Sequence, residues 1–445
     1  MKLSLPKSVS FVINTLENAG FECFAVGGCV RDSLSLREVN DWDFTTSATP
    51  NEIIECFCDY TTIDIGKEFG TICVVINGQN FEITTYRTDG DYTDSRHPDT
   101  VTFSKNLSDD LSRRDFTINA MAYNDRVGLV DEYGGLNDLN LGVIRCIGDA
   151  DTRFNEDALR ILRALRFASV FSYSIESNTS ESILKNKDKL SLVSSERITK
   201  ELTKLLCGKS VDFILRRYKD VIAVIIPEVS GMFNFNQNTP HHNKDLWRHT
   251  VSSVKNVEPL EVLRVAMLLH DIGKPMTAFT DKKGVSHFPN HQKLGAAMAS
   301  AILKRLKFKN SFISTVSMLI ENHDNRLECV SADIKRCMRD LGADNTRLLL
   351  SIQRADILAQ SAYMRAQKLS TLDAVCAEFE RILQSGECYS LDTLQVNGKD
   401  IIHLGVSSGE LIGAILKELL NKVIDGEVKN EKESLLLYAK NLISN

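Results

Sequence analysis

Two short stretches near the amino end combine residue types that handle phosphate groups and metal ions. In residues 25–32, Ala-Val-Gly-Gly-Cys-Val-Arg-Asp, the paired glycines allow a tight turn, and their N–H groups can point at phosphate oxygens. Arg31 can donate two hydrogen bonds to a phosphate. Asp41 and Asp43 follow in an extended stretch, where a period of two places both carboxylates on one face. A lone turn or strand end has no such meaning, but the ordered combination predicts nucleotidyl transfer.

The paired carboxylates indicate how this chemistry would work. Two like charges so close together require a cation, and oxygen ligands suit Mg²⁺ together with waters and substrate phosphates. In a two-metal site one ion lowers the pKa of an attacking hydroxyl, and the other neutralises the leaving group. No dedicated side-chain base is then needed. We therefore expect Asp41 and Asp43 to bind Mg²⁺.

Further candidates follow along the chain. Residues 81–86, Phe-Glu-Ile-Thr-Thr-Tyr, alternate like a strand and make Glu82 a candidate third carboxylate, although an exposed strand glutamate fits the pattern equally well. Residues 89–98 are rich in Asp, Gly and Pro and predict an irregular loop beside the site. Arg114 is a candidate phosphate or sugar contact, with a structural Arg–Asp pair as the alternative.

Residues 155–167 predict a helix whose charged face could recognise a base. On that helix Arg160, Arg163 and Arg166 sweep an arc beside Asp157. An aspartate beside an arginine presents an acceptor and donors, which match the pairing edge of cytosine or adenine. Uracil and guanine invert that pattern and would leave polar groups unpaired. The alternative is a surface helix with ordinary charge pairs.

The motifs of the first half stand in a definite order. They are Gly27-Gly-x-Val-Arg-Asp32, Asp41-x-Asp43, the loop at 89–98, Arg113-Arg-Asp-Phe-Thr-x-Asn-Ala120, Asp131-Glu-Tyr-Gly-Gly135, Glu156-Asp-x-x-Arg160 and Glu196-Arg-Ile198. This order resembles that of class II CCA-adding tRNA nucleotidyltransferases and their bacterial poly(A) polymerase relatives. The resemblance covers roughly the first 220 residues, far more than a lone motif.

This resemblance implies a fold and a set of site residues. The fold would be α+β: a polymerase-β-like head with a small mixed sheet, followed by a helical neck, body and tail. Asp41 and Asp43 would hold Mg²⁺ and, with Glu82 as the candidate third carboxylate, form the catalytic set. The nucleotide, CTP or ATP in a single pocket, would be bound by Gly28, Arg31, Arg114, Asp157, Arg160, Arg163 and Arg166.

The activity implied is template-independent addition of C, C and A to the 3′ end of tRNA, with release of pyrophosphate. Relatives that add only the two cytidines have a shortened loop, so the full loop at 89–98 favours an enzyme that also adds the adenosine. A poly(A) polymerase, or an enzyme adding only the final adenosine, is the alternative within the same chemistry. From other classes, the head could be an RNA-binding module beside a phosphohydrolase, or the whole chain a non-enzymatic RNA-binding protein.

The second half has a cluster of its own. Seven of the nine histidines lie between His241 and His323, and a helical segment ending in His270-Asp271 breaks at the following Gly and Pro. Imidazoles and carboxylates at such separations could bind one or two divalent transition ions and generate hydroxide at neutral pH. The region resembles the HD phosphohydrolase domain. That resemblance implies a site for Ni, Mn, Co or Fe, with a scaffold that lacks turnover as the alternative. Its ligands would be His249, His270, Asp271 and Asp356, with His287, His291 and His323 as candidates for a second position.

Charge and pattern divide the chain into four expected domains: a head at 1–150, a neck at 151–220, an HD-type body at 221–360 and a tail at 361–445. The head has 12 Lys+Arg against 24 Asp+Glu, whereas the neck has 14 against 10. An acidic head suits metal ions, and the basic neck is where an RNA backbone could approach.

The remaining composition excludes several classes. The 11 cysteines show no CxxC spacing, and no signal peptide precedes them, so we expect reduced thiols in a cytoplasmic protein. No apolar run reaches the roughly 18 residues that a membrane span needs. No pattern indicates an oligomeric state.

Overall fold

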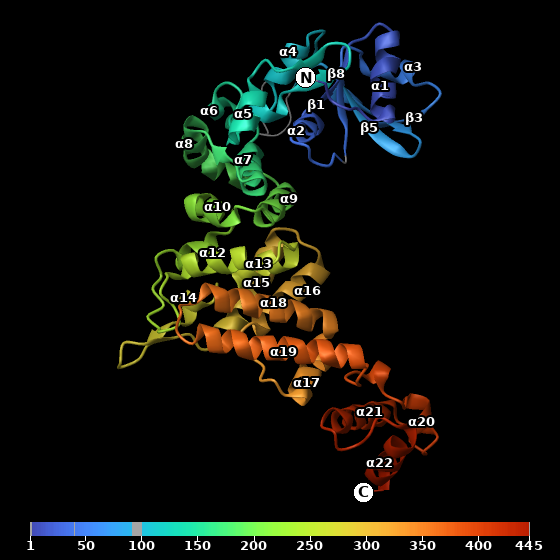
Figure 1. Ribbon diagram of the computed structural model, residues 1–445, viewed down its shortest axis with the longest axis vertical. Helices are drawn as coiled ribbons and strands as arrows, with labels where there is room; N and C mark the ends of the chain where they lie inside the picture. Colours follow the sequence, from blue (N-terminus) through green and yellow to red (C-terminus); the bar gives the residue numbers. More distant parts are fainter. Residues whose placement is uncertain (1, 40, 91–99, 445) are drawn as a thin grey trace. The chain divides into compact units, whose positions relative to one another are not determined.

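The computed structural model describes residues 2–39, 41–90 and 100–444 (Figure 1). The chain forms two compact units, Met1–Pro227 and Glu228–Asn445. A seven-stranded sheet lies in the first unit, and the second is almost entirely helical. The predicted α+β class is therefore confirmed. The finer divisions expected near residues 150 and 360 stay predictions.

The main sheet mixes parallel and antiparallel neighbours. Strand β1 pairs antiparallel with β2 and β8, whereas β2 pairs parallel with β5. All four residues of β1 are buried, as expected for a strand covered on both faces, whereas β5 alternates buried and more exposed positions, as expected for a strand covered on one face. In sheet order the strands are β3 (Thr61–Gly66), β4 (Thr71–Ile76), β5 (Gln79–Thr85), β2 (Asp43–Thr46), β1 (Cys23–Val26), β8 (Ala122–Asn124) and β9 (Gly128–Val130).

Helix α1 (Lys7–Asn18) covers the sheet with an apolar face. Its buried residues recur at helical spacing, and they pack with Phe44, Ile72 and Phe81 in one core. The other helices of this half of the unit are α2 (Gly28–Leu34), α3 (Pro50–Cys56), α4 (Leu107–Ser112) and α5 (Gly135–Leu141), with 3₁₀ turns η1 (Lys67–Phe69) and η2 (Thr117–Asn119).

The rest of the first unit is a helical layer joined to the sheet. Strand β10 (Val143–Ile144) pairs parallel with β11 (Ser174–Ile175), and α7 packs against α9. The elements are α6 (Ala150–Glu156), α7 (Leu159–Phe171), α8 (Ser177–Asn186), η3 (Lys187–Leu192), α9 (Ser195–Leu206), α10 (Val211–Arg217) and α11 (Lys219–Ile225).

The second unit is a stack of helices followed by three helices at the carboxyl end (Figure 1). Helix α18 packs against α12, α13 and α16, and this bundle positions the histidines. Among the described residues, no helix is both long and apolar enough to cross a membrane. The elements are η4 (Pro227–Met232, which begins one residue before the unit), α12 (Leu246–Asn256), α13 (Glu261–Leu269), α14 (Lys274–Thr277), β12 (Phe279–Thr280), β13 (Ser286–His287), α15 (His291–Arg305), α16 (Asn310–Asn322), α17 (Ser331–Leu341), α18 (Ala343–Ala359), α19 (Arg365–Ser385), η5 (Leu391–Thr393), α20 (Gly398–Ile402), α21 (Gly409–Ile424) and α22 (Lys432–Ser444).

Candidate functional site

The glycine turn joins β1 to α2. Gly27 has a φ of 81°, and a Cβ there would lie 3.0 Å from Nη1 of Arg114 and 3.6 Å from the carbonyl oxygen of Asn119. At Gly28, the first residue of α2, an added Cβ would meet only Nη2 of Arg31, at an ordinary 3.7 Å. The turn therefore requires glycine at position 27, where the Arg114 guanidinium rests against the backbone.

Three carboxylates gather where β2 begins. Asp43 pairs with Glu82 of β5 in parallel register. The next residue on each strand is buried, and successive side chains in a strand alternate between faces. The side chains of Asp43 and Glu82 therefore share the less buried face of the sheet. Partial burial raises the pKa of Asp43; Arg114 opposes the rise and Asp41 adds to it. Burial also raises the pKa of Glu82, with further increases from Asp43 and Asp41. Oxygen donors that repel one another in this way fit a divalent cation.

Arg114 lies between these carboxylates and a buried aspartate. Its Nη2 donates to Oδ2 of Asp110 at 3.0 Å, and Arg113 donates to the other oxygen. Burial disfavours the charged carboxylate, but the two arginines still hold the pKa of Asp110 below its ordinary value. Nε of Arg114 is buried without a hydrogen-bond partner among the described residues. Arg114 is thus a fixed cation beside the glycine turn.

The guanidinium of Arg31 is held in place by hydrogen bonds to neighbouring side chains. Its Nε and Nη2 donate to the two oxygens of Asp32 at 2.9 and 2.7 Å, and Nη1 donates to Asn119. Its guanidinium also lies over the rings of Phe167 and Phe171, at 5.1 and 4.8 Å from the centroids. The predicted phosphate contact therefore has a second role, because Arg31 ties α2 to α7.

The expected single helix over residues 155–167 is wrong. Helix α6 ends at Glu156, Asp157 has an extended backbone with φ −145°, and α7 begins at Leu159. Oδ1 of Asp157 accepts a hydrogen bond from the Leu159 N–H at 3.0 Å. A hydrogen bond from the backbone N–H to an aspartate side chain two residues earlier competes with the backbone hydrogen bonds of a helix, and here the helix is interrupted. The break places the Asp157 carboxylate at the start of α7.

Asp157 and Arg160 are close in sequence but do not bond each other through their side chains. Asp157 accepts from Nη2 of Arg197 at 2.7 Å, whereas Arg160 donates to Glu156 and to the carbonyl oxygen of Arg113. Sequence reasoning assigned no role to Arg197, although it is the arginine of the Glu-Arg-Ile motif at 196–198. Asp157 and Arg160, which were predicted to recognise a base together, are therefore each bound to a different side chain.

Arg163 and Arg166 also have carboxylate partners. Nε of Arg163 donates to Oδ2 of Asp115 at 2.8 Å, and Nε of Arg166 lies 2.5 Å from Oε2 of Glu201. Although burial opposes ionisation, Arg163 and Asn119 lower the pKa of Asp115 to about 2. Both carboxylates are buried. The structural Arg–Asp pair weighed for Arg114 forms with Asp110, whereas Asp115 pairs with Arg163.

The predicted loop lies largely outside the described residues, which omit 91–99. Its start differs from the expectation, because Asp89 ends a short strand. β6 (Arg87–Asp89) pairs antiparallel with β7 (Val101–Phe103), so the described flanks form a small two-stranded ladder.

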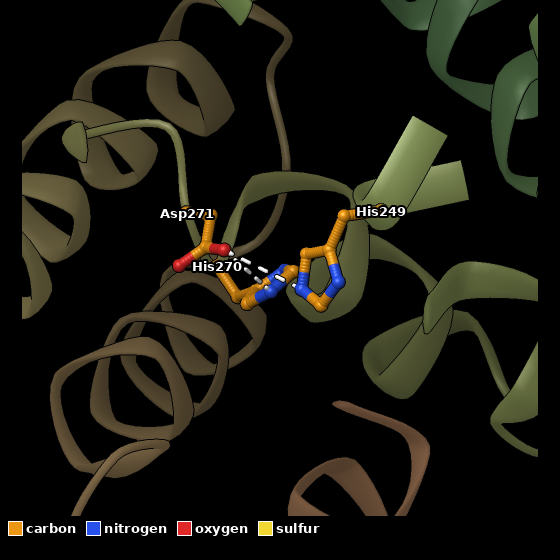
Figure 2. Close-up of side chains that lie close together, drawn as sticks. All are labelled: His249, His270 and Asp271. Atoms are coloured by element: carbon orange, nitrogen blue, oxygen red, sulfur yellow. Dashed lines mark ion pairs between the residues drawn. The ribbon is translucent and has the colours of Figure 1, made fainter. Parts of the chain in front are cut away.

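In the second unit the predicted ligands come from separate helices and meet in the interior. His249 lies on α12, His270 and Asp271 directly follow α13, and Figure 2 shows these three side chains converging. His291 begins α15 and Asp356 lies on α18. All of them, together with His323 after α16, are buried. The structure thus brings together every residue predicted for this site except His287.

Asp271 is shared between two groups of histidines. Its Oδ2 lies 3.2 Å from Nε2 of His270 and 3.6 Å from Nε2 of His249. Its Oδ1 lies 3.5 Å from Nε2 of His291 and 3.6 Å from Nε2 of His323. In each group the possible ligand atoms lie within 4.8 Å of one another. One carboxylate facing two imidazole pairs is an arrangement that suits two neighbouring cations.

The histidine rings are oriented by backbone carbonyls. Nδ1 of His270 bonds the carbonyl oxygen of Met267 at 2.8 Å, and His291 and His323 make the same bond to residues three positions earlier, at 2.8 and 2.7 Å. A carbonyl only accepts, so Nδ1 carries the proton and Nε2 keeps its lone pair in the neutral ring. Nε2 of His270 and of His291 and Oδ1 of Asp271 have no hydrogen-bond partner among the described residues. Buried, unpartnered lone pairs that face one another fit a metal ion.

Asp356 completes the cluster from α18. Its Oδ1 lies 3.0 Å from Nε2 of His249, while Oδ2 accepts from Arg326 and Gln360. Burial disfavours the charged carboxylate, yet His249 and Arg326 hold the pKa of Asp356 well below its ordinary value. His287 stands apart, because its exposed ring pairs with Asp281 at 2.9 Å.

A pocket of about 360 Å³ opens beside the cluster. Its lining combines ligand candidates with basic side chains, among them Lys274 and Lys368. Nζ of Lys274 donates to Oδ2 of Asp271 at 2.7 Å, so this lysine is paired with the cluster itself.

Comparisons with known proteins match three parts of the chain to family models. Residues 23–145 match the family model described as "Poly A polymerase head domain". Residues 172–231 match "Probable RNA and SrmB- binding site of polymerase A", and residues 288–439 match "tRNA nucleotidyltransferase domain 2 putative".

Relatives and a solved structure extend the match. A CCA-adding enzyme of Lactobacillus delbrueckii subsp. bulgaricus is 47% identical over 217 residues, which is 49% of this chain and 54% of that protein, so this match spans about half the relative's length. The CCA-adding enzyme of Ligilactobacillus salivarius is 30% identical over 97% of this chain and 95% of its own length. The crystal structure of the Bacillus stearothermophilus CCA-adding enzyme in complex with CTP superposes with a TM-score of 0.74 at 26% identity, covering 98% of this chain and 97% of that one. Because the similarity to the Ligilactobacillus salivarius enzyme runs through 97% of this chain, the chain belongs to the family of CCA-adding enzymes, and it is a nucleotidyltransferase.

Proposed function

We propose that this chain adds C, C and A in turn to the 3′ end of tRNA, using CTP and ATP and releasing pyrophosphate. The observation that carries the proposal is the grouping of Asp41, Asp43 and Glu82 beside Arg114 and the Gly27 turn. The names of the relatives support the same activity. Because we propose a tRNA substrate, we also propose that the protein acts in the cytoplasm.

The reaction forms a bond between the tRNA 3′-oxygen and the α-phosphorus, and it breaks the bond from that phosphorus to the departing pyrophosphate. Asp41 and Asp43, with Glu82 as third carboxylate, would hold Mg²⁺, which activates the hydroxyl and neutralises the leaving group. Arg114 would bind the triphosphate, because it is a fixed cation with a buried Nε that lacks a partner among the described residues. The N–H of Gly28, at the first position of α2, would donate to a phosphate oxygen.

Base selection would fall to the start of α7. We propose that the nucleotide takes over from Arg197 and Glu156 as the partner of Asp157 and Arg160. The carboxylate then accepts from the exocyclic amine of cytosine or adenine, and the guanidinium donates to the ring nitrogen. Arg163 and Arg166, held by Asp115 and Glu201, would complete the pocket wall.

The test uses purified protein, Mg²⁺ and tRNA transcripts that end before CCA, within it, or one nucleotide short of it. CTP and ATP are supplied separately and together, and the 3′ ends are sequenced. Completion of all three transcripts supports the proposal. Long adenosine tails would identify a poly(A) polymerase, and growth of only the last transcript would identify an enzyme that adds the final adenosine alone.

A second activity is favoured by one specific observation, the buried and unpartnered Nε2 atoms around Asp271. We propose that His249, His270, Asp271 and Asp356 hold a divalent ion such as Ni, Mn, Co or Fe, with His291 and His323 at a second position. Such ions supply an activated water for the hydrolysis of phosphate esters. Nδ1 bonds to backbone carbonyls keep the imidazoles in the tautomer that this role requires.

The second proposal is tested by loading the protein with Ni²⁺, Mn²⁺ or Co²⁺ and supplying a 2′,3′-cyclic nucleotide. Metal binding with hydrolysis supports the proposal. Metal binding without hydrolysis of any phosphate ester supports the scaffold alternative instead.

A further inference from the structure

The pocket beside the histidine cluster holds an ammonium group that has no close counter-ion among the described residues. Lys368, on α19, lines this pocket together with the cluster residues Asp271, His291, His323 and Asp356. The lysine is half-buried, so its charge acts in a medium less polar than bulk water. A cation in such a place needs a source of negative charge.

Both hydrogen-bond partners of Lys368 are neutral. Its Nζ donates to Oε1 of Gln360 at 2.6 Å and to Nδ1 of His241 at 3.2 Å. Across residues 2–39, 41–90 and 100–444, no carboxylate oxygen lies within 4.0 Å of Nζ, and Asp356 and Asp324 act on it only at longer range. Lys274 on the same pocket wall is different, because it is paired with Asp271.

Gln360 links this ammonium to the cluster. Its Oε1 accepts from Lys368, and its Nε2 donates to Oδ2 of Asp356 at 2.9 Å. The other oxygen of Asp356 faces His249 at 3.0 Å. One amide therefore fixes the distance between Lys368 and the proposed metal ligands.

His241 adds a second donor. Its Nδ1 accepts from Lys368, so the proton of the neutral ring lies on Nε2. Burial and the neighbouring Lys368 lower the pKa of His241, which keeps the ring neutral. The ring packs on Tyr363 at 5.0 Å between centroids and lines the same pocket.

We propose that Lys368, assisted by His241, binds an anionic oxygen of a phosphate ester while the cluster faces another oxygen of the same phosphate. This makes Lys368 the residue that selects phosphate esters, and the inference rests on the proposed phosphohydrolase function. In the hydrolysis, a water oxygen bonds to phosphorus, the ester P–O bond breaks, and the leaving alcohol takes a proton that originates from that water. A volume of about 360 Å³ suits a substrate of nucleotide size.

The test is a calorimetric titration of the Mn²⁺-loaded protein with inorganic phosphate, using Lys368→Met, Lys368→Arg and the control Lys293→Met. Lys293 is an exposed lysine of α15 outside the pocket lining. We expect Lys368→Met to weaken phosphate binding about tenfold or more, the size of one lost charge-assisted hydrogen bond. Lys368→Arg should restore part of the affinity, and Lys293→Met should bind as the unchanged protein does. Mn²⁺ affinity should be equal in all four proteins.

Several results would overturn the inference. The first is that the unchanged protein does not bind phosphate. The second is that Lys368→Met binds phosphate as tightly as the unchanged protein. The third is a parallel loss of phosphate and Mn²⁺ affinity in Lys368→Met, which would indicate a structural role. Hydrolysis of p-nitrophenyl phosphate and of its bis ester is measured on the same samples. Phosphate binding that depends on Lys368 without hydrolysis supports the anion site and contradicts the proposed function. Hydrolysis together with phosphate binding that does not depend on Lys368 supports the proposed function and contradicts the anion site.

Discussion

At the scale of single residues, the carboxylates that we propose as metal ligands should lower the stability of the head when no ion is bound. Asp41, Asp43 and Glu82 repel one another, and the pKa values of Asp43 and Glu82 are raised by partial burial and by this mutual charge. A carboxyl group whose folded pKa is raised binds more protons in the folded than in the unfolded state. Its contribution to stability therefore falls as pH rises through the folded pKa. A bound divalent ion would remove that cost.

Asp43→Asn should separate the two effects. Removing one charge relieves the repulsion, so we expect Tm at pH 7.5 to rise by about 1–2 °C and the difference in Tm between pH 4 and pH 7.5 to shrink. Nucleotide addition should fall by about 10³-fold or more, because a metal ligand is lost. Calorimetry and a primer-extension assay measure the two quantities. A variant that is less stable at pH 7.5 and still active would contradict this account of the three carboxylates.

The buried ion pair between Arg163 and Asp115 gives the opposite pH dependence. Arg163 and Asn119 overcome the burial penalty and lower the pKa of Asp115 to about 2. Its stabilisation is fully present above the ordinary carboxyl pKa near 4 and is lost as pH falls toward 2. We expect Arg163→Met to lower the free energy of unfolding at pH 7 by about 2–4 kcal/mol, because a buried carboxylate loses its partner.

Urea denaturation at pH 7 and pH 3 measures this effect, and the loss should be smaller at pH 3. The control is Arg126→Met, an exposed arginine 3.5 Å from Glu17, which should change stability by about 0.5 kcal/mol or less. Equal losses in the free energy of unfolding in the two variants would show that the Arg163–Asp115 pair stabilises the protein no more than an exposed ion pair does.

At the scale of elements, a turn and a helix break position the site, and the sequence predicted them unequally. Period-two alternation predicted the face of Glu82, because a strand's geometry is local. It did not predict the break at Asp157, since the helical pattern continues through 155–167 and only a side-chain bond to the backbone interrupts it. Arg197 and Glu201 were missed for another reason, because they reach α7 through the packing of α9, some 40 residues away.

The turn can be tested with two neighbouring glycines. Gly27→Ala must adopt a φ of 81° and place its Cβ 3.0 Å from Arg114, whereas Gly28→Ala meets nothing closer than 3.7 Å. We expect the first variant to lose about 1–2 kcal/mol of stability and at least about tenfold in KM for CTP, through displacement of Arg114. Gly28→Ala should keep the KM for CTP within twofold and leave the stability nearly unchanged, since alanine retains the N–H. Steady-state kinetics and urea melts check this, and equal effects in the two variants would contradict the required turn.

At the scale of the whole molecule, two candidate sites lie in two separately compact units. The ordered motifs predicted the nucleotidyltransferase head, and the histidine-rich segment with its resemblance to the HD domain predicted that His249, His270, Asp271 and Asp356 gather at one site. Distances within the cluster were beyond prediction, because they depend on how α12, α15, α16 and α18 pack. The separation leads us to expect independent chemistry.

Paired variants test that independence. Asp41→Ala should abolish nucleotide addition and leave Mn²⁺ binding by the histidine cluster unchanged. His270→Ala should weaken Mn²⁺ binding by about 10-fold to 100-fold and leave addition within twofold. Addition is measured with Mg²⁺ alone, and Mn²⁺ binding by calorimetry. Loss of both properties in either variant would mean that the two sites depend on each other.

We propose above all that this chain completes a tRNA 3′ end with three nucleotides and then stops. The most direct measurement incubates a tRNA transcript lacking CCA with the protein, Mg²⁺, CTP and ATP, and sequences every 3′ end. We expect ends in C, C and A with CTP and ATP together, two cytidines with CTP alone, and no growth with Asp43→Asn. Tails of adenosine, growth from ATP alone, or full activity of Asp43→Asn would contradict it.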